Sequence, residues 1–159
     1  MDRQRILAVA LAVVGFAAIV VGIQQELLHV APGYEGTIET GWGGRINHEE
    51  RLLAQLAGVG VVGTLVTLRW KYAAVVPLVI GGVELGYSIR AVLHYVQDPG
   101  LYTQVQKYDG TTTRLILGAE PFLLVAGGLF LLGAGVVGWR LHQQSATAHD
   151  RSTGTLLQT

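Results

Sequence analysis

Three ionisable residues lie inside long apolar stretches of the chain, and their presence there needs a chemical reason. Glu84 and Arg90 fall in the stretch 73–93, and Glu120 falls in the stretch 115–138. At the centre of a membrane-spanning helix such a residue costs about 2.5–3.5 kcal/mol to insert. A carboxyl group in that setting can carry a proton or a cation, and an arginine can neutralise it.

Arg90 and Glu120 are predicted to form an ion pair. If residues 73–93 and 115–138 cross a membrane in opposite directions, a rise of about 1.5 Å per residue puts both side chains at a similar depth. Pairing keeps both charges inside a helix bundle, and Gln55 is expected to donate to the same network. We interpret the pair as a device that sets helix register, with an ion or substrate pathway as the alternative.

Glu84 is predicted to lie roughly 16 Å deep, close to the middle of the membrane. Desolvation disfavours its charged form, so we expect a neutral carboxylic acid at neutral pH. Tyr87 and Ser88 follow on the same helix face and are expected to hydrogen-bond to it. The acid then either joins this helix to a neighbour or serves as a proton or cation relay, and contact with a lipid or quinone is a further use.

No other residue pattern predicts catalysis, a cofactor or a metal site. Cysteine is absent, which excludes disulfides, thiolate metal sites and cysteine nucleophiles. The five histidines are scattered, and no two have the i, i+4 spacing of a helical metal site. A nucleophile, a base and an orienting residue do not occur as a set, and no run of basic residues could neutralise a nucleic-acid backbone. We therefore expect no enzyme activity, no metal, no cofactor and no nucleic-acid partner.

The apolar residues around these side chains are gathered in blocks rather than spread at amphipathic spacing. Half of the 159 residues are hydrophobic, 14% are charged, and the formal net charge is zero. Four blocks have about the length that spans a hydrocarbon core about 30 Å thick. They cover residues 6–23, 52–68, 73–93 and 115–138. The sequence thus predicts an all-α membrane protein, with a four-transmembrane-helix antiparallel bundle in residues 1–142 and a flexible polar tail in residues 143–159.

The orientation of this bundle follows from its basic residues. Only the four residues 69–72 separate the second block from the third, so these two helices are expected to be antiparallel neighbours. Six basic residues fall on the side of this link and four on the other, which by the positive-inside rule puts both termini in the cytoplasm of a cell membrane. Nine arginines against two lysines are a composition typical of a GC-rich prokaryotic genome.

Two polar segments, 24–51 and 95–114, are predicted to face outward. Residues 33–40 resemble a strand that enters a glycine turn at 41–44, and residues 102–108 are strand-like, so a small extracellular β-sheet is expected to join the two segments. This layout is similar in outline to claudin-like tetraspan proteins. The claudin signature needs a pair of cysteines, which this chain lacks, so the resemblance implies an architecture and no function.

Small residues in the apolar blocks predict close helix packing. Gly82 and Gly86 form a GxxxG motif, whose expected use is packing within the bundle, with oligomerisation or docking to a larger membrane complex second. These features favour a structural or accessory subunit that packs against other membrane proteins and exposes an outer loop surface. Its expected partners are membrane lipids and either further copies or a larger complex. The alternative is a small transporter or channel component that uses Glu84, Arg90 and Glu120.

Overall fold

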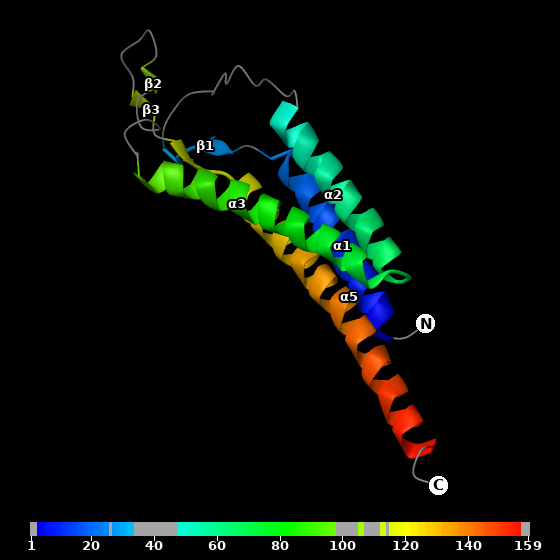
Figure 1. Ribbon diagram of the computed structural model, residues 1–159. Coiled ribbons are helices and arrows are strands. Elements are labelled where there is room, and N and C mark those ends of the chain that lie inside the picture. Colours follow the sequence, from blue (N-terminus) through cyan, green and yellow to red (C-terminus); the bar gives the residue numbers. More distant parts are fainter. Residues whose placement is uncertain are drawn as a thin grey trace.

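Four helices packed side by side dominate the protein (Figure 1). The computed structural model describes residues 3–25, 27–33, 48–97, 105–106, 112–113 and 115–156. The helices are α1 (Arg3–Gly22), α2 (His48–Thr67), α3 (Val75–Gln97) and α5 (Glu120–Leu156). A 3-10 turn, η1 (Lys71–Ala74), leads directly into α3.

In the described part of the chain, three helical segments are long and apolar enough to cross a membrane, and they are Arg3–Gly22, Lys71–Gln97 and Glu120–Gln143. For these three, the prediction of helices with the length and composition of membrane spans is confirmed. Helix α2 is also 20 residues long, but its first turn carries Glu49 and Glu50, and it is not among these three segments. A fourth crossing by α2 stays a prediction.

Helix α5 differs from its predicted bounds at both ends. Residues 115–117 form the strand β4 (Leu115–Leu117), and the helix begins only at Glu120. Pro121 then lies in the first turn, where its missing N–H costs least. At the other end α5 continues to Leu156, so most of the segment 143–159, for which composition predicts a flexible tail, has helical backbone. Extending an existing helix needs no new nucleation, which explains how this polar segment can follow it.

Two short antiparallel strand pairs accompany the helices. Strand β1 (Leu28–Val30) pairs with β4, so that Leu28 lies opposite Leu117. Strand β2 (Val105–Gln106) pairs with β3 (Thr112–Thr113). The first pair joins the segment that follows α1 to the segment that precedes α5 (Figure 1).

The β-sheet predicted between the two polar segments is not confirmed among the described residues. Of the strand predicted at 33–40 only Gly33 is described, and the glycine turn at 41–44 lies outside the described residues. Gly33 has φ of +90°, a conformation that glycine adopts without the steric cost of a Cβ atom. Of the strand predicted at 102–108 only β2 is described, and it pairs with β3 of the same segment. Strand β1 of the first segment pairs instead with β4, which follows the second segment.

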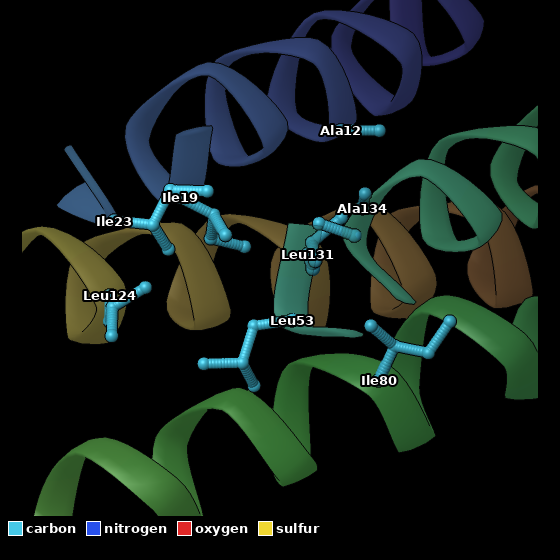
Figure 2. Packing of buried hydrophobic residues seen from close by; sticks show 9 residues of the cluster. Ala12, Ile19, Ile23, Leu53, Ile80, Leu124, Leu131 and Ala134 are labelled. Atoms are coloured by element: carbon cyan, nitrogen blue, oxygen red, sulfur yellow. The ribbon is translucent and has the colours of Figure 1, made fainter. Parts of the chain in front are cut away.

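The four helices meet at a core of small and aliphatic side chains (Figure 2). Helix α5 packs along α1 and α3, and α2 packs against these same two helices. The buried cluster consists of Ala12, Ile19, Ile23, Leu53, Ala57, Ile80, Leu124, Leu131 and Ala134. All four helices contribute to it, so each helix is fixed by contacts with more than one neighbour.

Two pairs of glycines let α5 approach α1 and α3 closely. A Cβ atom placed on Gly15 of α1 would lie 2.9 Å from the backbone oxygen of Gly127 on α5. A Cβ atom placed on Gly81 of α3 would lie 2.7 Å from the backbone oxygen of Gly128. Because Gly127 and Gly128 are adjacent, α5 packs closely against both α1 and α3 at the same height along its axis. Neither contact leaves room for a side chain.

The end of α2 is tied to α5. His142 Nε2 donates to the backbone oxygen of Thr67 at 2.6 Å, and Thr67 is the last residue of α2. The last carbonyl groups of a helix have no partner within it, so His142 satisfies one of them. Gly138 makes the approach possible, because a Cβ atom there would lie 2.7 Å from Thr67 Cγ2.

Candidate functional site

Glu84 is the most unusual side chain in the described part of the chain. It lies in the middle of α3, its exposed fraction is 0%, and neither carboxyl oxygen has a hydrogen-bond partner. Its Cβ atom lies against α5, where a Cβ atom placed on Gly128 would be only 3.2 Å away. The acid is therefore held at the crossing of α3 and α5, in contact with neighbours that leave its polar atoms unsatisfied. Burial of an unpaired carboxyl group is costly, so this position is a candidate for function.

The two hydroxyl groups predicted to bind the Glu84 carboxyl point elsewhere. Ser88 is buried and donates to the backbone oxygen of Glu84 at 2.7 Å, the usual bond of a serine to the carbonyl one turn back. Tyr87 donates across to α2, where its hydroxyl lies 3.3 Å from Glu49 Oε2. The predicted hydrogen bonds from Tyr87 and Ser88 to the carboxyl group are therefore not formed.

The predicted ion pair between Arg90 and Glu120 is not formed either. Glu120 is the first residue of α5 and is 4% exposed, whereas Arg90 is exposed on α3, and in the described part of the chain no ion pair joins them. Depth alone suggested the pair, but six residues along the helix place Arg90 about 120° around the helix axis from the buried Glu84, away from the interior. Gln55, expected in the same network, is exposed on α2.

Three glutamates lie near Tyr87 at the end of the bundle where α2 begins. Glu49 and Glu50 lie in the first turn of α2, where carboxylates favourably face the helix dipole. Together with Glu120 they act electrostatically on the Tyr87 hydroxyl. Among the described residues no group of three or more His, Asp or Glu side chains is arranged to hold a metal ion.

Gly82 and Gly86 face outward rather than into the bundle. Both are exposed, and a Cβ atom placed on either would meet nothing within 4 Å. The prediction that this GxxxG motif packs within the bundle is therefore wrong. The glycine that packs is the neighbouring Gly81, which sequence reasoning had not singled out from the other glycines. A GxxxG spacing reports that two glycines share a helix face, but it carries no signal for which face the fold turns inward.

The outward face of α3 carries Gly82 and Gly86 together with the side chains of Val79, Val83 and Arg90. Arg90 follows Gly86 by one helical turn, so the two glycines and the arginine lie along one stripe. An apolar surface with two open glycines and a cation at one end can accept a second helix at close range. This outward face, defined by these five residues, is the second candidate site.

No protein family, curated protein or solved structure matches this chain. Its class therefore follows from its own fold: a helical protein with three helices long and apolar enough to cross a membrane. The buried Glu84 and the outward face of α3 are the two candidate sites that this fold presents.

Proposed function

We propose that this protein is a multi-pass structural or accessory subunit that docks a transmembrane helix of another membrane protein on the outward face of α3. The observation that carries the proposal is the open space at Gly82 and Gly86. Glycine in a helix is less favourable than alanine by about 1 kcal/mol, so two exposed glycines weaken α3 without helping the packing of this chain. A close partner backbone gives them a use.

Arg90 indicates what the partner should offer. It is exposed within the candidate span Lys71–Gln97, and in the described part of the chain it takes part in no ion pair. A cation on a lipid-facing helix is costly unless it pairs or reaches the membrane surface. The partner helix is therefore expected to carry small residues opposite Gly82 and Gly86 and an acidic side chain opposite Arg90.

The membrane setting of the proposal rests on the three apolar helices, with α2 as the fourth crossing. The exposed basic residues of the α2–α3 link support an orientation with both termini in the cytoplasm. The strand pairs and the start of α2 then lie outside, where they would form the outer loop surface. A cell-membrane location, this orientation and a place in a larger assembly belong to the proposal.

Photo-crosslinking in native membranes tests the docking face. A photo-reactive amino acid at Val83, beside the two glycines, should give one discrete protein adduct. The same amino acid at Val62, which is 59% exposed on α2, serves as the matched control and should give none. Replacing both Gly82 and Gly86 by Leu should remove the Val83 adduct, because the larger side chains hold the partner backbone away.

Three outcomes would contradict the proposal. They are adducts with lipid alone at Val83, equal protein adducts at Val83 and Val62, and a Val83 adduct that survives both glycine substitutions. An adduct with a second copy of this chain would show that the protein forms a homo-oligomer and would contradict the accessory-subunit hypothesis. Mass spectrometry of the adduct distinguishes these cases.

A second candidate function, a proton relay, is favoured by Glu84 alone. A carboxyl group with both oxygens buried and unpartnered is suited to exchange a proton, and Glu120 lies buried on the adjoining helix. Vesicles containing the full chain should then show pH-driven proton flux that Glu84→Gln abolishes, because the amide cannot release a proton at ordinary pH. Absence of flux in the parent protein would remove this candidate and leave the accessory role.

A further inference from the structure

Five exposed basic residues are brought together at one end of the helix bundle. Arg3 and Arg5 begin α1, Arg69 and Lys71 flank the turn between α2 and α3, and Arg140 lies on α5. We name this set the basic end, and all five side chains are exposed.

Contacts between helices fix these separate segments at the same level. His142 binds the last carbonyl of α2 at Thr67, which places Arg140 beside the α2–α3 turn. Helices α1 and α5 are antiparallel, because Gly22 meets Leu123 while Gly133 meets Leu11. The start of α1 therefore lies beside the part of α5 that follows Gly133. Figure 1 shows the start of α1 and the α2–α3 turn at the same end of the helix bundle.

The charge of this end is not balanced by acids among the residues whose side chains are described. The acidic residues in that set are Glu49, Glu50, Glu84 and Glu120. The first two begin α2 and the last begins α5, at the opposite end of the bundle, while Glu84 lies in the middle of α3. Among the residues whose side chains are described, the basic end therefore carries a net positive charge.

Aromatic side chains lie among these cations. Trp70 is 74% exposed and Tyr72 is 71% exposed, and Trp139 on α5 is exposed as well. Lys71 Nζ lies 4.9 Å from the centre of the Tyr72 ring. Tryptophan and tyrosine with their rings outward are typical of the headgroup level of a membrane, where an apolar ring and a polar edge are both accommodated.

From this combination we infer that the basic end binds the phosphate groups of anionic phospholipids. The cations lie on three separate segments of the bundle, namely α1, the α2–α3 turn and α5, which suits several lipid headgroups arranged around a helix bundle. The aromatic rings would lie beside the upper acyl chains of the same lipids. A lipid headgroup, not free phosphate, is the ligand, because only a lipid engages the cations and the rings together. This inference is independent of the helix-docking proposal.

Tryptophan fluorescence offers a local test. With Trp42→Phe as the background, emission comes from Trp70 and Trp139, both of which lie at the basic end. The full chain is reconstituted in phosphatidylcholine vesicles that contain either brominated phosphatidylglycerol or brominated phosphatidylcholine as quencher. We expect phosphatidylglycerol to quench several-fold more strongly at equal content, and 0.5 M salt to reduce the difference by screening.

Charge-neutral variants decide whether the basic end causes this preference. Arg69→Gln combined with Lys71→Gln should lower the relative affinity for phosphatidylglycerol, by about fivefold per removed charge at most. Arg140→Gln, on a different helix, should lower it in the same direction. Arg51→Gln is the matched control, since Arg51 is exposed near the start of α2 and its loss should leave the preference unchanged.

The following results would overturn the inference. One is equal quenching by the two lipids in the parent protein, and another is an unchanged preference in all basic-end variants that retain native helicity by circular dichroism. Loss of the preference in Arg51→Gln to the same extent would show a general effect of net charge. Suppression of the preference by millimolar inorganic phosphate at constant ionic strength would indicate a free-phosphate site instead of a lipid contact.

Discussion

At the scale of single residues, Gly81 and Gly82 show how far one position in a helix can change a side chain's surroundings. A Cβ atom on Gly81 would lie 2.7 Å from the Gly128 oxygen and 2.9 Å from the Leu132 nitrogen, both backbone atoms that cannot turn aside. A Cβ atom on Gly82 would meet nothing within 4 Å. The same substitution at these neighbours should therefore have opposite effects.

We expect Gly81→Ala to lower the free energy of unfolding by about 1–3 kcal/mol, because α3 and α5 must move apart. Gly82→Ala should raise it by up to about 1 kcal/mol through better helix propensity. Thermal or denaturant unfolding in detergent micelles measures both, with the parent protein alongside. Equal effects at the two positions would contradict the described orientation of α3.

Glu84 offers a second residue-scale prediction. Methionine has a similar volume and no charge, so Glu84→Met removes two unsatisfied buried oxygens while filling the same space. We expect the free energy of unfolding to rise by about 1–3 kcal/mol in micelles. Glu84→Gln keeps the shape and a polar group and should change stability little. A clear loss of stability in Glu84→Met would mean that the carboxyl group has a partner in the folded protein.

At the scale of elements, α3 has two faces with different tasks. One face packs Gly81 and Glu84 against α5 and sends Tyr87 toward α2. The other face presents Gly82, Gly86 and Arg90. In the described part of the chain, the two glycines have open space beside them and Arg90 takes part in no ion pair. A helix that combines a close internal crossing with an open outward face can remain in place while a second helix docks. This division of faces explains why the docking proposal does not require α3 to move.

The hydrogen bond from His142 to the last carbonyl group of α2 leads to a prediction at the scale of elements. His142→Ala should lower the free energy of unfolding by about 0.5–1.5 kcal/mol, because the Thr67 carbonyl loses its donor. The loss should be local, with faster amide hydrogen exchange in the last turn of α2 than in α1. His142→Gln can still donate and should recover part of the protection. If exchange rises equally in all helices, the bond has no particular role at the end of α2.

At the scale of the whole molecule, the two ends of the bundle differ in charge. The basic end carries Arg3, Arg69 and Arg140, and the other carries Glu49 and Glu120. In a membrane this difference favours one orientation, with the basic end on the cytoplasmic side. The proposed lipid-binding surface at the basic end and the proposed outer loop surface therefore lie at opposite ends of the bundle.

Because the chain has no cysteine, single-cysteine variants can report its orientation without background. In intact cells, Lys71→Cys should be protected from a membrane-impermeant maleimide, and His48→Cys should be labelled. Both positions are exposed in the structure, so access to reagent depends on the side of the membrane. Labelling of both after the membrane is opened is the control. The reverse pattern in intact cells would invert the proposed topology.

Much of this protein follows from its sequence alone. For α1, α2 and α3 the apolar blocks predict helices of about the observed length, because a helix is the structure that satisfies its own backbone in an apolar surrounding. The sequence also excludes disulfides, thiolate metal sites and cysteine nucleophiles, because the chain has no cysteine. The spacing of its histidines likewise gives no helical metal site. The depth of Glu84 was also predictable from its place in the middle of a block, but its burial was not, because its neighbour Val83 at the same depth is 47% exposed.

What the tertiary structure decided is which way each side chain turns. Depth is a sum of rises along one helix and can be read from the sequence, but rotation depends on where the neighbouring helices pack. For that reason Arg90 and Glu120 share a predicted depth without forming the predicted pair, and Gly81 packs where Gly82 was expected to. The sequence already places the residues of the basic end on one side of the membrane. Packing decides how close they come, because contacts such as that of His142 with Thr67 hold the ends of separate helices at one level.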